Sequence, residues 1–252
     1  MFLRLWRFGC IIEIVEENNK RRVIIMSKLN NRITVVCILS IAICVCAFLF
    51  IYYGNKNEEF DYNEHLDEHV IKVSDDKGMV EPIVVNLQEM AYYIMNVEGD
   101  IQQMACQYDS EHPEKYWLIR IESTYDMKDY AKDLVYDSCV RDTIYYMEAL
   151  KAGVELTKEE QELAANDAKI IMENLTGKQM ELSDYTQDAL YSLEKKLYLA
   201  SKYVNTLTEE GYKMEELELE GSYYKELVSS YNIEVNDEVW DKVVLGELSI
   251  TQ

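Results

Sequence analysis

The stretch ITVVCILSIAICVCAFLFIYY, residues 33–53, organises the rest of the chain. Its 21 residues include no charged residue, no proline and no glycine. As a helix it would be about 31 Å long, at ~1.5 Å per residue, which matches the hydrocarbon core of a bilayer. Phe48, Leu49 and Phe50 lie where a signal-peptidase site would need small residues. The sequence therefore predicts an uncleaved transmembrane anchor. A lipoprotein is a weaker alternative, because a small residue should precede the modified cysteine, whereas Ile43 precedes Cys44 and Val45 precedes Cys46.

Charge differs sharply between the two sides of this anchor. Residues 1–32 carry seven Lys or Arg and three Glu, a net charge of +4, whereas residues 54–252 have a net charge of −26. Positive residues beside a first membrane segment stay in the cytoplasm. We therefore expect a single-pass bacterial cell-membrane protein with a cytoplasmic N-terminal segment and with residues 54–252 outside the cytoplasm. Translation from Met26 is an alternative to Met1, since MSKLNNR is an ordinary beginning for a signal anchor.

The exported part has few residues suited to metal or redox chemistry. Its two cysteines, Cys106 and Cys139, could form a disulfide or could be small buried apolar residues. No Cys/His spacing typical of zinc is present, and we expect no cofactor. Residues 65–69, HLDEH, fit the zinc-protease pattern H-x-x-E-H but lie in a polar stretch. We favour a solvated segment there, with weak incidental metal binding and an enzyme as the alternatives.

Organisation after the anchor is predicted from composition and periodicity. Residues 54–80 are acidic with little apolar periodicity, and predict a flexible spacer before a domain at residues 81–252. Residues 83–85 indicate a short extended segment. Asn86 and Glu89 then predict a helix N-cap, and that helix should end near residues 110–113.

Glycine separates the remaining segments, because no proline follows Pro113. Gly153, Gly177, Gly211 and Gly221 each follow a helical pattern, as expected of C-terminal caps. The predicted helices after the first are residues 126–152, 157–176, 183–209 and the closing helix at about 222–231. The helix at 126–152 is apolar around most of its circumference and should be central. The helix at 183–209 has an apolar stripe that should pack into a local bundle. A short strand at residues 233–235 and a last turn capped by Asn236 complete a domain that we predict to be all-α.

Four segments, in order, resemble the SurA/PrsA-type chaperone domain of extracytoplasmic peptidyl-prolyl isomerases. They are LQEMAYYIMN with YDSEHPEKYW (87–96 and 108–117), DYAKDLVYDSCVRDTIYYMEALKAG (129–153), GVELTKEEQELAANDAK (153–169) and YYKELVSSYNIEVNDEVWDKV (223–243). The resemblance implies a helical domain that binds unfolded or partly folded exported polypeptides.

The chain departs from that family at one place. A parvulin-type isomerase domain commonly precedes the closing helix, but only residues 212–221 lie there, and all three histidines are upstream. The resemblance therefore does not imply isomerase activity, and we expect no catalytic residues.

Tyrosine and methionine are abundant in the exported part, with 18 and nine residues respectively. Tyr offers a rigid apolar face with a polar end, and Met is adaptable, so together they suit varied peptide ligands. We predict a membrane-anchored chaperone-like protein that binds non-native chains without ATP. An envelope adaptor that holds one folded partner is the alternative, and a peptidyl-prolyl isomerase is a remote one. The net charge argues against nucleic-acid partners. The candidate peptide-binding residues are Tyr92, Tyr93, Met95, Tyr145, Tyr146, Met147, Tyr191, Tyr198 and Tyr203.

Overall fold

A computed structural model describes residues 60–250, which belong to one compact unit. The predicted anchor at 33–53, the cytoplasmic segment 1–32 and the first residues of the predicted spacer lie outside the described residues. Among residues 60–250, no helix combines the length and the apolar character needed to cross a bilayer.

The described part contains helices of very different lengths and five strands. The helices are η1 (Tyr62–His65), α2 (Leu87–Tyr108), α3 (Glu114–Trp117), α4 (Met127–Lys151), α5 (Lys158–Asn174), α6 (Gly177–Ser183), α7 (Gln187–Glu209), α8 (Met214–Leu217), α9 (Ser222–Val228) and α10 (Asp237–Trp240). The strands are β1 (His69–Asp75), β2 (Ile83–Asn86), β3 (Arg120–Glu122), β4 (Tyr125–Asp126) and β5 (Tyr231–Val235).

The fold is mostly helical, with 61% helix and 11% strand. The prediction of an all-α domain is wrong in one respect, because the antiparallel strands β2, β1 and β5 form a three-stranded sheet in that order. Val73 pairs with Ile83 on one side and with Ile233 on the other, so the sheet joins the two ends of the described chain. The extended segments predicted at 83–85 and 233–235 are the two outer strands.

The predicted flexible spacer is wrong for its described portion. Strand β1 lies inside it, and the side chains of Val70, Ile71 and Val73 are fully buried. The apolar residues of this strand stand between acidic flanks, which dominate the composition of the segment. Its stabilising partner β5 is about 160 residues away in sequence, so local composition could not indicate the pairing.

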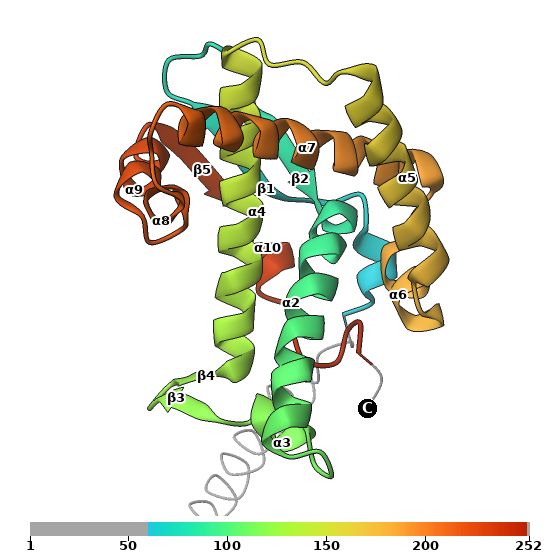
Figure 1. Ribbon diagram of the computed structural model, residues 1–252. Helices are drawn as coiled ribbons and strands as arrows, with labels where there is room; N and C mark the ends of the chain where they lie inside the picture. The colour runs from blue at the N-terminus through green and yellow to red at the C-terminus, as the bar shows by residue number, and fades with distance from the viewer. Residues whose placement is uncertain (1–59, 251–252) are drawn as a thin grey trace, which may run out of the picture. The chain divides into compact units, whose positions relative to one another are not determined.

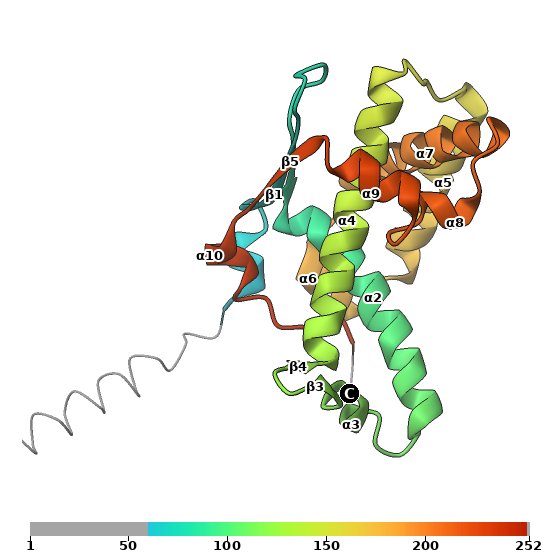
Figure 2. The ribbon, with the colours of Figure 1, turned by 90° about the vertical axis from the view of Figure 1, so that its left-hand side faces the viewer.

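Helix α2 forms where the cap pattern predicts it. The Asn86 side chain accepts a hydrogen bond from the Glu89 backbone N–H at 2.9 Å, and the helix ends at Tyr108. Helix α4 is central, as predicted, and packs against α2, α7 and the sheet. Figure 1 shows α7 crossing α4, with α2 alongside, and Figure 2 shows the sheet on one side of α4 and α5 and α7 on the other. Helices α2, α4 and α7 form the frame of the candidate site.

The prediction that glycines end helices holds at two positions and fails at two. Gly153 and Gly211 follow α4 and α7 with φ of 67° and 106°, the left-handed region that glycine adopts at helix ends. Gly177 instead begins α6, a helix that the sequence did not predict, after a capping box made by Thr176 and Gln179. Gly221 is the N-cap of α9, which ends at Val228 rather than near residue 231.

The C-terminal residues are held to the helices by a buried carboxylate. Glu98, in α2, accepts backbone hydrogen bonds from Gly246 and Leu248 on Oε1 at 2.6 and 3.2 Å. Its Oε2 accepts from the backbone N–H and the hydroxyl of Ser249, both at 2.6 Å. The Glu98 side chain is fully buried. In the sequence this residue interrupts an apolar stripe, whereas in the structure it fixes the end of the chain.

Candidate functional site

The candidate site is a groove bounded by α2, α4, α7 and the segment around α8. Its first hollow has a volume of about 450 Å³. A second hollow of about 360 Å³ adjoins it, because Tyr92, Leu197, Ser201 and Asn205 line both. We call the two hollows together the α7 groove.

Helical periodicity places one set of side chains from each long helix in this groove. On α7, Glu194, Leu197, Ser201 and Asn205 recur at intervals of three or four residues, so they share one helix face. The apolar stripe of the same helix overlaps this face, because Leu190 and Leu207 are buried whereas Leu197 and Val204 line the groove. The stripe therefore both holds α7 in the core and gives the groove its apolar surface.

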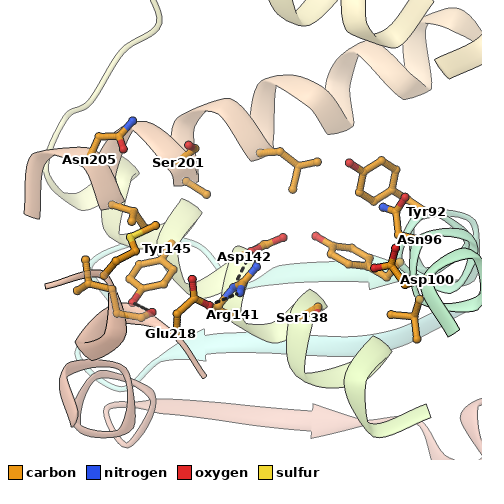
Figure 3. Close-up of a pocket in the computed structure, with 17 residues that line it drawn as sticks. Tyr92, Asn96, Asp100, Ser138, Arg141, Asp142, Tyr145, Ser201, Asn205 and Glu218 are labelled. Atoms are coloured by element: carbon orange, nitrogen blue, oxygen red, sulfur yellow. Dashed lines mark hydrogen bonds and ion pairs between the residues drawn. The ribbon is translucent and has the colours of Figure 1, made fainter. Parts of the chain in front are cut away.

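Helix α2 contributes the facing wall with the same periodicity. Tyr92, Asn96 and Asp100 are four residues apart and line the first hollow. Figure 3 shows these three side chains across the hollow from Ser201 and Asn205 of α7. This wall therefore presents one aromatic, one amide and one carboxylate group in a row.

The floor comes from α4 and is crossed by ion pairs. Arg141 pairs with the neighbouring Asp142 at 3.0 Å and with Glu218 at 3.0 Å, as Figure 3 shows. Burial raises the pKa of Asp142 above its ordinary value, although Arg141 opposes that effect. The Tyr145 hydroxyl donates to the Leu217 carbonyl at 2.6 Å, which ties α4 to α8. The floor is thus both charged and fixed in position.

The second hollow lies between α7 and α5. Lys202 donates to Glu160 Oε2 at 2.6 Å, and this hydrogen bond lowers the pKa of Glu160. The Tyr198 hydroxyl donates to Asp167 Oδ2 at 2.5 Å, which raises the pKa of Tyr198 to about 12. Burial, and secondarily the charge of Asp167, raises the pKa of Glu194 to about 7. This hollow therefore contains one carboxyl group that titrates near neutral pH.

The nine predicted peptide-binding residues separate into three groups. Four of them line the α7 groove: Tyr92, Tyr93, Tyr145 and Tyr198. Tyr146, Tyr191 and Tyr203 are half-buried and lie outside its lining. Met95 and Met147 are buried in the core, so their proposed role as an adaptable contact surface is wrong. Sequence reasoning also missed Ser201, Asn205 and Glu194, because no local pattern distinguishes them from other polar helix residues.

The positions of the two cysteines and of the HLDEH residues exclude a disulfide and a zinc-protease helix. Cys106 is exposed and Cys139 is fully buried, and both are free thiols, so the disulfide between them is absent. His65 belongs to η1 and His69 to β1, so the HLDEH residues do not form the helix that the protease pattern requires. Within residues 60–250, no group of His, Cys, Asp and Glu is arranged to hold a metal ion.

A second surface feature lies at the far end of α2, near α3 and β3 in Figure 1. Large apolar side chains are exposed there, with Leu118 at 67% exposure. The others are Met104, Tyr108 and Ile121. A hollow of about 400 Å³ beside them is lined by Trp117, Leu118 and Ile250, among others.

No family model, curated protein or solved structure matches this chain.

Proposed function

We propose that this chain is a membrane-anchored, extracytoplasmic chaperone-like protein that binds non-native exported polypeptides in the α7 groove without ATP. The observation that carries the proposal is the groove itself, which is open and has tyrosine rings and carboxylates on its walls. Binding would be reversible and would involve no covalent step.

The mixture of groups in the groove suits extended segments of varied sequence. Tyr92, Leu197 and Val204 offer apolar surface to side chains of a bound segment. Asn96 and Asn205 offer amide donors and acceptors to its backbone. An open groove that combines both kinds of contact imposes few requirements on sequence, as is typical of promiscuous binding surfaces.

The charge of the groove favours basic or neutral clients. The first hollow is lined by three carboxylates and one guanidinium: Asp100, Asp142, Glu218 and Arg141. The second hollow has Glu160 and Glu194 with a single ammonium group, that of Lys202. An acidic polypeptide would therefore meet like charge in both hollows, which costs binding free energy.

The expected anchor at residues 33–53 gives the groove its place in the cell. A tethered domain meets chains that emerge from the membrane at a high effective concentration, without any additional contact. Weak binding to each segment would then suffice for transient protection.

Aggregation of an unfolded model protein tests this function. The full-length chain, purified in detergent micelles, should suppress light scattering by a reduced model protein at several-fold excess and without ATP. Ser201→Trp should abolish the suppression, because a large side chain at a position shared by both hollows fills the groove. Ser192→Trp is the matched control, since Ser192 is exposed on the same helix outside the groove. Equal suppression by both variants, or no suppression by the wild type, would reject the proposal.

A single folded partner is the second candidate, and the exposed apolar residues near α3 favour it. Leu118 and Ile121 lie outside the α7 groove and could pack on a preformed surface. Cross-linking in native membranes distinguishes the two functions. One recurrent partner linked near Leu118 would indicate an adaptor, whereas many clients linked along α7 would indicate a chaperone.

A further inference from the structure

Glu194 differs from the other buried carboxylates among residues 60–250. Its side chain is 6% exposed, and Oε1 has no hydrogen-bond partner among the described residues. Glu98, by contrast, accepts hydrogen bonds on both oxygens, and Asp75 is paired with Lys151 at 2.8 Å. A buried carboxylate without a partner destabilises the folded state. A residue that carries such a cost is a candidate for function.

The lysines nearest to Glu194 on α7 are all engaged by other groups. The Lys195 Nζ atom lies 4.4 Å from the centre of the Tyr191 ring. Lys196 forms its ion pair with Glu89. Lys202 donates to Glu160 and to the Glu155 carbonyl. Because these three ammonium groups contact other partners, they do not neutralise Glu194. Its carboxylate can therefore bind a cationic group of a ligand.

The surroundings of Glu194 suit an organic cation. It lines the second hollow together with Tyr92 and Tyr198, whose rings can contact a cation through their π faces. Burial raises the pKa of Tyr92 to about 12, so both tyrosines are neutral at physiological pH. Asp167, held by the Tyr198 hydroxyl, adds negative potential nearby.

We propose that Glu194, flanked by Tyr92 and Tyr198, forms a subsite of the α7 groove for a lysine or arginine side chain of a bound polypeptide. This inference rests on the proposed function and adds a sequence preference to it. A cation in the hollow would supply the partner that the carboxylate lacks, and charge-assisted hydrogen bonds of this kind are strong.

The preference should depend on pH. The titratable groups around the hollow are Tyr92 from α2, Glu160 and Asp167 from α5, and Tyr198 and Lys202 from α7. The pKa of Glu194 is raised to about 7, whereas the pKa of Glu160 is lowered and the pKa values of Tyr92 and Tyr198 are raised to about 12. Below this pKa the carboxyl group is protonated and attracts a cation weakly, so the preference should grow as the pH rises from 6 to 8.

Removing the charge should also stabilise the protein. A carboxyl group whose folded-state pKa is raised above its ordinary value of 4.5 costs stability once the pH exceeds that value. Glu194→Gln should therefore raise the melting temperature at pH 8 and change it little at pH 4.5. Glu162→Gln is the matched control, because Glu162 is exposed on α5 outside the groove, and it should have little effect at either pH.

Peptide binding measured by fluorescence anisotropy tests the subsite directly. The probes are labelled 12-residue peptides, rich in Leu and Tyr, that differ only in a central lysine or norleucine. The full-length wild type in detergent should bind the lysine peptide about tenfold more tightly at pH 8. Glu194→Gln should reduce this ratio to near one, whereas Glu162→Gln should preserve it. Equal affinity of the wild type for both peptides would overturn the subsite while leaving the proposed function intact. If neither peptide binds, both proposals fail.

Discussion

The attachment of the C-terminal residues to Glu98 leads to a quantitative prediction. The carboxylate accepts four hydrogen bonds from residues 246–249, and three of the donors are backbone N–H groups. Each hydrogen bond to a charged group contributes about 1.5–3 kcal/mol, and a buried donor that loses its acceptor pays its own desolvation cost. Glu98→Ala removes the acceptor for every one of these donors.

Glu98→Ala should lower the free energy of unfolding by about 4 kcal/mol, less than the sum of the four hydrogen-bond contributions. The reason is that residues 243–250 can detach and let water solvate the freed N–H groups. Detachment exposes the buried side chains of Val243 and Leu245. The free energy of unfolding lost in Glu98→Ala cannot exceed the cost of that exposure, because the segment would detach instead. Glu98→Gln keeps one acceptor oxygen, but its amide group places an N–H donor against another donor. We therefore expect it to lower the free energy of unfolding by about 2 kcal/mol.

Urea unfolding combined with hydrogen exchange measures both parts of this effect. The free energy of unfolding should fall in the order wild type, Glu98→Gln, Glu98→Ala. The amides of Gly246, Leu248 and Ser249 should exchange faster in both variants. Gln103→Ala is the control, since Gln103 is exposed on the same helix and should change stability by no more than about 0.5 kcal/mol. A loss below about 0.5 kcal/mol for Glu98→Ala, with unchanged exchange of these amides, would refute the reasoning.

Two further predictions concern the sheet and the turn before α9. The Lys151 ammonium donates a hydrogen bond to Asp75 at 2.8 Å and lowers the pKa of the Asp75 carboxyl group below its ordinary value of 3.8. The ionised carboxylate should therefore stabilise the fold above pH 3.8, and this stabilisation should be lost as the pH falls below 3.8. Unfolding of Asp75→Asn measured from pH 7 to pH 3 should show a deficit that shrinks in acid, and a constant deficit would contradict this assignment. Gly221→Ala should destabilise by about 2 kcal/mol, because a Cβ there would lie 2.2 Å from the Glu216 carbonyl oxygen. Gly177→Ala should instead stabilise slightly in thermal melts, since a Cβ there meets no atom within 4 Å, and a loss at Gly177 equal to that at Gly221 would exclude the steric explanation.

The helices were predictable because their signals are local. Asn86 marks the start of α2 with a side-chain cap that forms as expected, and a capping box of Thr157 with Glu160 begins α5. The apolar stripe of α7 placed that helix in the core, and the central position of α4 followed from its apolar circumference. Even so, Tyr130 on α4 is 41% exposed, so the apolar circumference is not buried throughout.

The sheet and α6 were missed for different physical reasons. Strand β1 depends on a partner near the other end of the chain, and its acidic flanks dominate local composition. Helix α6 begins at Gly177, although a glycine after a helical pattern predicts a C-terminal cap. The capping box of Thr176 with Gln179 was the signal that could have indicated a new helix.

The candidate site was only half predictable. Tyr92 and Tyr198 stood out through the unusual tyrosine content, and both line the groove. Glu194 is one of 44 acidic residues in residues 54–252, so nothing in the sequence distinguished it. Its isolation results from the pairing of Lys196 with Glu89 and of Lys202 with Glu160, contacts that only the tertiary structure determines.

Site-specific photo-cross-linking tests the central claim, that non-native chains bind in the α7 groove, most directly. Benzoylphenylalanine is introduced into the full-length chain at Ser201, which lines both hollows, or at Ser192, which is exposed on the same helix away from them. Each protein is then irradiated with a labelled, reduced model polypeptide. Our account predicts adducts from position 201 that disappear when the polypeptide is allowed to fold first, and few adducts from position 192. Equal labelling at the two positions, or labelling at 192 alone, would contradict it.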